Sequence, residues 1–310
     1  MITRRNIRIK VMQVLYQLDV NEDSANNNAT KILQNNLNQT SRLFTYLIYF
    51  LTEVARYAEK DASLRAAKHL ATSADKNINI KLAGNNLLWK ILENNSYKKA
   101  LNDNKFSFEQ TGNLVRRMYN NLTASSQYQS YINTPGREPQ EEREILSFIF
   151  TDLMLPDESF ISHIEEYFTN WDDDAEMLNT LMLGFLQKPA GLNLQQMPDK
   201  EKNDFAIELL KTVLDKKDYV NTLIKARLKN WDPERIAALD MILMQMGVCE
   251  FLYFPTIPPK VTINEYIDLA KEYSTAQSGQ FVNGILDSIH KDLLKENKIH
   301  KSEFKPKKAN

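Results

Sequence analysis

The sequence predicts an all-α protein, and three observations lead to this prediction. The 310 residues include only eight glycines, and regularly spaced short strands with Gly/Pro turns do not occur. Hydrophobic residues make up 43% of the chain, which is enough for a packed core. Apolar residues recur three or four positions apart over long stretches, which is the period of an amphipathic helix.

The first helix is predicted within residues 1–20, and its amino end is basic. Its apolar face consists of Ile7, Val11, Val14, Leu15 and Leu18. Arg4, Arg5 and Arg8 cover an arc of about 100° around the helix. Positive charge is unfavourable there, because the backbone dipole is already positive at this end. Two explanations stay open: a solvated first turn, or guanidinium groups that contact phosphate oxygens.

Between residues 21 and 199 the pattern alternates between helices and breakers. Helices are predicted over 41–71, near 87–92, over 112–131, and from 140 to about 187. Residues 21–40 are rich in Asn and are predicted to be a loop or a weak helix start. Two segments that contain Pro and Gly, at 133–139 and 188–198, are predicted to interrupt the helices.

From residue 200 onward the chain is predicted to be helical up to a Lys-rich tail. Asp232 and Pro233 fit the start of a central helix that is apolar around most of its circumference. Gly247 in its middle costs about 1 kcal/mol relative to Ala. We expect a neighbouring helix to cross closely there, and a flexible hinge is the alternative.

Two further helices follow Pro258 and Ser278. Thr262 and Glu265 fit a capping box for the first of them. Lys260 precedes it, where a lysine serves solubility or, near a helix amino end, an anionic ligand. Phe281 lies in the first turn of the second helix, off its apolar stripe, where it packs against the preceding loop or stacks on a nucleobase.

The net charge of −1 conceals a patterned distribution. Residues 1–20 and 291–310 are basic, whereas residues 138–176 contain thirteen acidic residues and one arginine. Such segregation is compatible with a face that binds a polyanion. A single cysteine, Cys249, excludes an internal disulfide framework and fits a reducing compartment.

Other classes of protein receive little support. No apolar run reaches the roughly 18 residues that a membrane span needs. The Arg-rich start also resembles an organelle transit peptide, but Asp19 ends it, so we expect a cytoplasmic protein without membrane association. The four histidines are scattered, and neither a P-loop nor a G-x-G-x-x-G turn is present. We therefore expect no enzyme, no cofactor and no metal site.

Four segments resemble the NusB family of transcription antitermination factors. They read RRNIRIKVMQVLYQLD, LKNWDPERIAALDMILMQMGVCEFLY, PPKVTINEYIDLAKEY and SGQFVNGILD. The resemblance implies a NusB-like helical bundle of two packed sub-bundles. Here the Arg-rich helix at 1–20 and a C-terminal sub-bundle at 200–295 are expected to flank a helical insertion at 21–199, with a disordered basic tail at 296–310.

The resemblance also implies a function. Members of the family bind boxA-type single-stranded RNA together with NusE, a ribosomal protein, and help RNA polymerase to read through terminators, notably in ribosomal RNA synthesis. Carried over by motif, the RNA-binding residues are Arg4, Arg5, Arg8, Lys260, Gln280 and Phe281, and the partner-binding candidates are Asp240 and Glu250.

Two features depart from the family pattern. Gln280 stands where a basic residue is often found, which weakens the expected RNA affinity. The acidic block at 138–176 has no counterpart, and it either shields RNA or recruits a basic partner. The alternative function is a helical protein-interaction scaffold that does not bind RNA.

Overall fold

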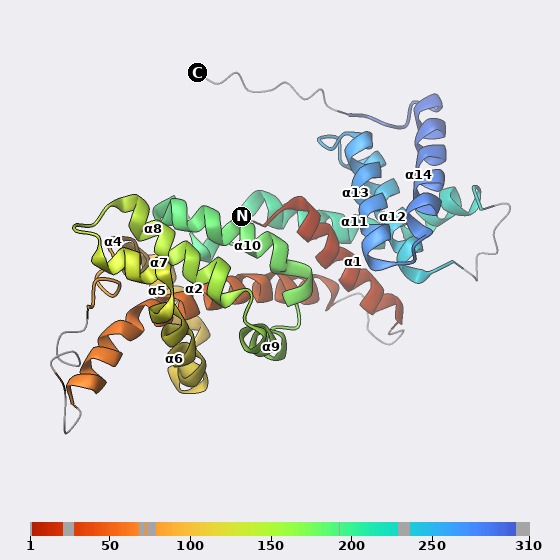
Figure 1. The fold of residues 1–310 in the computed structure, drawn as a ribbon. Helices are drawn as coiled ribbons and strands as arrows, with labels where there is room; N and C mark the ends of the chain where they lie inside the picture. Colours follow the sequence, from red (N-terminus) through yellow and green to blue (C-terminus); the bar gives the residue numbers. More distant parts are fainter. Residues whose placement is uncertain are drawn as a thin grey trace, which may run out of the picture. The chain divides into compact units, whose positions relative to one another are not determined.

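The computed structural model describes residues 2–20, 28–67, 72, 79–191, 193–228 and 236–301. All regular secondary structure in these ranges is helical, which confirms the predicted all-α class (Figure 1). The chain divides into two compact units: unit 1 spans residues 38–198, and unit 2 combines residues 2–37 with 199–310. The predicted caps Asp232 and Pro233 lie outside the described residues.

Unit 2 is built around one buried helix. Its helices are α1 (Arg4–Val20), α11 (Lys200–Lys225), α12 (Ala238–Tyr253), α13 (Pro259–Tyr273) and α14 (Ser278–Lys295). Helix α12 contacts each of the other four, and its residues from Ile242 to Phe251 are all buried. The prediction of a central apolar helix is therefore confirmed.

Gly247 allows two neighbouring helices to pack closely against α12. A Cβ atom at this position would lie 2.9 Å from Leu286 Cδ2 and 3.3 Å from Tyr266 Cδ2. These atoms belong to buried side chains of α14 and α13. The expected close helix crossing is thus confirmed, and it explains a glycine in the middle of a helix.

The carboxyl end of α12 is closed by a residue from the predicted tail. Lys301 donates from Nζ to the carbonyl oxygens of Glu250, at 2.7 Å, and Phe254, at 2.9 Å. A lysine near the carboxyl end of a helix can donate to the last carbonyl groups in this way. Residues 296–301 were expected to be disordered, and this contact corrects that expectation for them. Residues 302–310 lie outside the described ranges.

Unit 1 contains most of the remaining helices. They are α2 (Ala29–Ala66), whose first residues group with unit 2, α4 (Asn86–Glu93), α5 (Asn95–Asn104), α6 (Phe108–Ala124), α7 (Ser126–Asn133), α8 (Pro139–Phe148), the π-helix η2 (Ile149–Met154), α9 (Glu158–Tyr167), α10 (Trp171–Gln187) and the 3-10 turns η3 (Pro189–Gly191) and η4 (Leu194–Gln196). The side chains of Asn85, Asn94, Ser125 and Asp157 cap α4, α5, α7 and α9.

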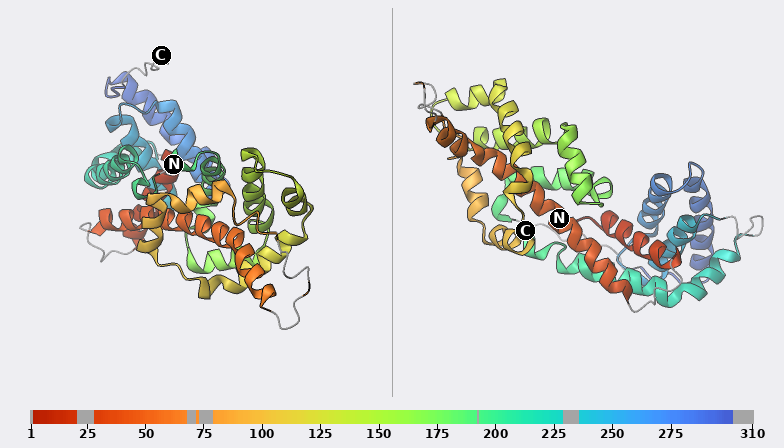
Figure 2. Two further views of the ribbon diagram at one scale, coloured as in Figure 1. Left: turned by 90° about the vertical axis from the view of Figure 1, so that its left-hand side faces the viewer. Right: turned by 90° about the horizontal axis from the view of Figure 1, so that it is seen from below.

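Helix α2 begins earlier than predicted. The Asn-rich segment was expected to be a loop or a weak helix start, yet it is helical from Ala29 (Figure 2). Ala29, Leu33 and Leu37 recur every four residues and are buried. Their burial outweighs the modest helix propensity of the intervening asparagines.

Two other predicted boundaries agree with the structure. The short helix near 87–92 corresponds to α4, and the breaker at 133–139 ends where α8 begins at Pro139. Gly136 has a φ of 81°, a conformation that glycine adopts at little cost. The predicted helix at 112–131 is instead two helices, because Ser125 caps a new one. Among the described residues, no helix is both long and apolar enough to cross a bilayer.

Candidate nucleic-acid interface

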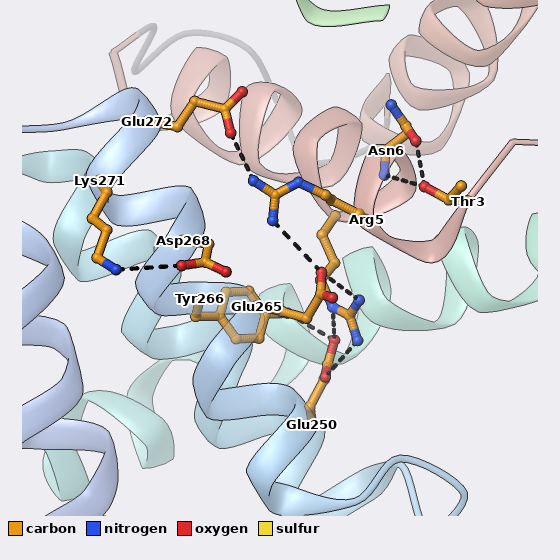
Figure 3. Close-up of polar contacts among 10 residues, drawn as sticks. Thr3, Arg5, Asn6, Glu250, Glu265, Tyr266, Asp268, Lys271 and Glu272 are labelled. Carbon is orange, nitrogen blue, oxygen red and sulfur yellow. Dashed lines mark hydrogen bonds and ion pairs between the residues drawn. The ribbon is translucent and has the colours of Figure 1, made fainter. Parts of the chain in front are cut away.

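All three amino-terminal arginines contact carboxylates in unit 2. Arg4 reaches Glu201 at 2.8 Å, and Arg5 reaches Glu272 at 2.7 Å. Figure 3 shows the Arg5 side chain extending towards Glu272 on one side and Glu265 on the other. The three arginines differ in exposure, and this difference decides which of them an external phosphate can reach.

Arg8 lies inside unit 2, and it is the anchor of α1. Its side chain is 3% exposed, and that of Glu250 is 0% exposed. Arg8 donates to both carboxylate oxygens of Glu250, from Nε at 2.7 Å and from Nη2 at 3.1 Å. Thr262 Oγ1 and Tyr266 OH donate to the same carboxylate at 2.9 Å and 2.8 Å. Glu250 thus accepts four hydrogen bonds in the core of the unit.

This arrangement sets the ionisation of the groups involved. Burial by itself lowers the pKa of Arg8, but the charges of Glu250, Tyr266 and Glu265 and the hydrogen bond to Glu250 together outweigh burial and raise that pKa above its usual range. Burial and the charge of Glu250 raise the pKa of Tyr266 well above its ordinary value. Arg8 therefore stays charged and paired, and the prediction that it contacts RNA is wrong, because a side chain that is 3% exposed is closed to an external phosphate.

The capping-box prediction for Thr262 and Glu265 is also wrong. Helix α13 begins at Pro259 and has no side-chain cap, so Thr262 already lies inside the helix. Its hydroxyl group points to Glu250 rather than to the backbone. Glu265 instead accepts from Arg8 Nη1 at 3.3 Å. Both side chains therefore form hydrogen bonds where α1, α12 and α13 meet.

Asp240 and Glu250 were expected to contact a partner protein, and the structure corrects this as well. Asp240 is 5% exposed and accepts a hydrogen bond from Ser278 Oγ at 2.8 Å. Because Ser278 is the first residue of α14, Asp240 fixes the start of that helix. Both carboxylates have internal partners and lie beneath the surface of unit 2.

Arg4 and Arg5 remain at the surface. Their side chains are 39% and 36% exposed, and their partners Glu201 and Glu272 are more exposed still. Ion pairs of this kind contribute about 0–1 kcal/mol, because water and salt screen them. A phosphate group can therefore replace Glu201 or Glu272 at little cost.

Lys271 was not predicted, and it lies between Arg5 and the start of α14. Its side chain is 61% exposed and pairs with Asp268 at 3.4 Å (Figure 3). A Cβ atom at Gly279 would lie 2.7 Å from Lys271 Cγ, so the lysine stem covers the first turn of α14. No local sequence signal marks Lys271, because only the packing of α13 on α14 brings it there.

Gln280 and Phe281 follow Gly279 in the first turn of α14. Gln280 is exposed, and Phe281 is partly exposed. The structure thus brings Arg5, Lys271, Gln280 and Phe281 to one end of the α13–α14 pair. Arg4 precedes Arg5 in the first turn of α1 and pairs with Glu201 of α11. We refer to these five residues as the Arg5–Lys271 surface.

Lys260 is exposed but lies elsewhere on unit 2. It is in the first turn of α13, eleven residues before Lys271. At 1.5 Å per residue, this separation is about 16 Å along the helix. The structure therefore places Lys260 at the opposite end of α13 from the Arg5–Lys271 surface.

The described ranges contain no site suited to metal or thiol chemistry. No group of three or more His, Cys, Asp or Glu side chains is arranged there to hold a metal ion. Cys249 is buried, and burial together with the charge of Glu250 raises the pKa of its thiol to about 12. The arrangement in unit 2 is suited to binding an anion at its surface.

Comparison with known proteins identifies the family. The model of the NusB family matches residues 164–291. The "Transcription antitermination protein NusB" of Desulfatibacillum aliphaticivorans is 45% identical over 104 residues, which are 34% of this chain and 73% of that protein. The chain belongs to the NusB family. The predicted resemblance to a long-form member is therefore confirmed.

Other NusB proteins match a similar share of this chain. That of Chloroherpeton thalassium is 38% identical over 104 residues, 34% of this chain and 49% of that protein. A solved structure of T. maritima NusB is 33% identical and covers 32% of this chain and 72% of that one, with a TM-score of 0.30. About two thirds of the chain thus lies outside each match to a NusB relative.

Proposed function

We propose that this protein is an RNA-binding transcription antitermination factor of the cytoplasm, and not an enzyme. In this proposal it binds boxA-type single-stranded RNA together with the ribosomal protein NusE and joins an antitermination complex of RNA polymerase, notably during ribosomal RNA synthesis. The observation that carries the RNA-binding part is the Arg5–Lys271 surface, where the cations Arg5 and Lys271 lie at the same end of the α13–α14 pair as an amide and an aromatic ring.

The residues of this surface suit a single strand of RNA. Arg4 and Arg5 offer planar guanidinium groups that match phosphate oxygens, and Lys271 adds a third charge. Phe281 supplies a ring for base stacking, which is worth about 1–3 kcal/mol per base. The Gln280 amide can donate to and accept from a base edge. A strand that continues along α13 would meet Lys260 about 16 Å further on.

The alternative, a helical scaffold without RNA binding, has one observation in its favour. Each of Arg4, Arg5 and Arg8 already has a carboxylate partner within the chain. If those pairs serve only to hold α1 in place, the basic amino end has no external ligand. The low stabilisation expected from the two exposed pairs supports RNA binding over this alternative.

A salt titration distinguishes the two functions. A labelled boxA-type RNA is titrated with the wild type and with the triple variant Arg4→Gln/Arg5→Gln/Lys271→Gln between about 50 and 200 mM salt. Each phosphate contact to a single strand contributes about 0.7 to the slope of log affinity against log salt, so the variant should lose about 2. Wild-type affinity and slope in the variant would reject the proposed surface.

A matched control separates a local effect from a change in net charge. Lys291→Gln/Lys295→Gln/Lys298→Gln removes three exposed lysines near the far end of α14. This variant has the same net charge as the first and should bind RNA nearly as well as the wild type. Retention of NusE by the immobilised protein tests the partner separately, and no retention would contradict that part of the proposal.

A further inference from the structure

Unit 1 carries a hollow that the proposed function does not use. It has a volume of about 580 Å³ and lies between α4, α8, the end of α10 and η3. This volume is within the range of small-molecule and nucleotide sites. Its lining combines one tryptophan, Trp89, with charged, amide and apolar side chains. The tryptophan indicates which kind of ligand fits the hollow.

Trp89 is exposed but held in one orientation. The residue is 47% exposed, and its indole Nε1 donates to the carbonyl oxygen of Ala83 at 3.0 Å. A ring with its polar edge engaged in this way has an apolar face left for contact. A tryptophan face in such a site can stack on a nucleobase, because every base has a π-face of similar size.

Two cations in the lining are available for an anion. Among the described residues, neither Lys90 of α4 nor Arg143 of α8 takes part in an ion pair. The carboxylate of Glu142 is 2% exposed and already accepts from Asn86 N at 3.1 Å and from Arg137 Nη1 at 3.2 Å. Glu142 therefore does not neutralise Lys90 or Arg143, and Glu93 is the one other carboxylate of the lining.

We propose that this hollow binds one nucleotide unit of a single-stranded RNA. The base stacks on Trp89, and the adjoining phosphates contact Lys90 and Arg143. Gln187 at the rim provides an amide for the base edge. The inference rests on the proposed function for the presence of RNA, and it assigns an RNA contact to the inserted helices, outside the Arg5–Lys271 surface.

A proline-rich peptide is the competing occupant. Pro139 and Pro189 lie in the lining near Leu186, and aromatic grooves of this kind also hold extended peptides. Lys90 and Arg143 outnumber Glu93, the one carboxylate of the lining that Arg137 does not pair with, and this excess of positive charge favours the polyanion over a neutral peptide. This difference makes the two occupants separable by salt dependence.

The test uses the full chain and a boxA-type RNA extended by about 12 nucleotides. Trp89→Ala should weaken binding about ten-fold, the loss expected for one stacked base, and Trp89→Phe should retain most of the affinity. Arg143→Gln should weaken binding and lower the salt slope by about 0.7. Glu93→Gln should strengthen binding, because it removes a negative charge beside the phosphates. A purely structural role for the hollow would not give these two charge variants opposite effects.

Controls keep the inference separate from the proposed function. Tyr167→Ala removes another aromatic residue of unit 1 that is 47% exposed, and it should leave affinity unchanged. RNA should also quench tryptophan fluorescence in the wild type, and this quenching should decrease in Trp89→Phe even if Trp89→Ala folds poorly. Trp171, at 7% exposed, is too buried to stack on an added strand.

The outcomes point to different conclusions. The first outcome is that Arg4→Gln/Arg5→Gln/Lys271→Gln loses RNA binding while the Trp89 and Arg143 variants keep wild-type affinity and quenching. This outcome would overturn the hollow as an RNA site and leave the proposed function standing. Competition by a proline-rich peptide with no response to RNA would also overturn it. A wild type that binds no RNA at low salt would overturn both.

Discussion

Arg8 Nε donates to Glu250 Oε1 at 2.7 Å across 242 residues of sequence, inside unit 2. This contact joins the first helix of the chain to the central helix α12. It also gives the three amino-terminal arginines two different roles. Arg8 holds α1 in place, whereas Arg4 and Arg5 stay at the surface, where their ion pairs are weak enough to be exchanged for phosphates.

Removal of Arg8 should destabilise unit 2 strongly. Arg8→Met leaves the Glu250 carboxylate buried without its counter-charge, and breaking a buried pair in this way costs about 3–5 kcal/mol. Arg4→Met removes an exposed pair and should cost less than about 1 kcal/mol. Urea unfolding measures both variants, and an Arg8→Met midpoint equal to that of Arg4→Met would show that the buried pair contributes little.

Gly247→Ala should lower the free energy of unfolding by about 1 kcal/mol. Overpacking a buried site costs about 1–3 kcal/mol, and the better helix propensity of Ala returns up to about 1 kcal/mol. The new Cβ would lie 2.9 Å from Leu286 Cδ2, so Leu286→Ala should relieve the clash. A double-mutant cycle by urea unfolding measures this coupling, and simple additivity of the two changes would contradict the packing argument.

The stability of the protein should fall as the pH is lowered through the histidine range. Burial lowers the pKa of His163, beside Tyr46, and that of His290, whose ring is 5.4 Å from Phe251. Below the ordinary value of 6.5 the unfolded chain therefore binds more protons than the folded one. The contribution of these groups is fully present above that pH and declines below it.

Nuclear magnetic resonance titration of the two imidazoles checks this directly. Both should titrate below pH 6.5, the ordinary value. His163→Gln keeps a polar group beside Tyr46 and should flatten the fall in the unfolding midpoint between about pH 7 and pH 5. An unchanged slope in this variant would assign the acid sensitivity to other groups.

Glu272→Gln should strengthen RNA binding at low salt. Glu272 competes for Arg5 at 2.7 Å, so its neutralisation releases the guanidinium for phosphate. We expect a gain of a few-fold, on the order of one exposed ion pair. Asp287→Asn makes the same change in net charge beside Lys291, further along α14, and should have a smaller effect. Fluorescence anisotropy of labelled RNA measures both, and equal gains would indicate a general charge effect only.

The local sequence predicted several features of this protein correctly. Helical spacing predicted the all-α class and the buried α12, and a glycine within an apolar helix predicted the close crossing of a neighbouring helix. The motifs predicted membership of the NusB family. These features depend on residues near one another in the chain, so period and propensity are enough to predict them.

The candidate surface was predicted only in part. Arg5, Gln280 and Phe281 lie at one end of the α13–α14 pair, whereas Arg4 pairs with Glu201 of α11. Lys271 was missed, and Lys260 lies at the other end of α13. Which residues share a surface depends on the direction in which two helices pack. Spacing within one helix contains no information about that direction.

The sequence by itself determined that α1 is a helix with a basic amino end, because charge and period are local properties. Only the tertiary structure decided that Arg8 faces Glu250 and is buried instead of lying at the surface. The physical reason is that a buried charge must find a counter-charge, and the packing of α1 against α12 and α13 supplied one from a distant part of the chain.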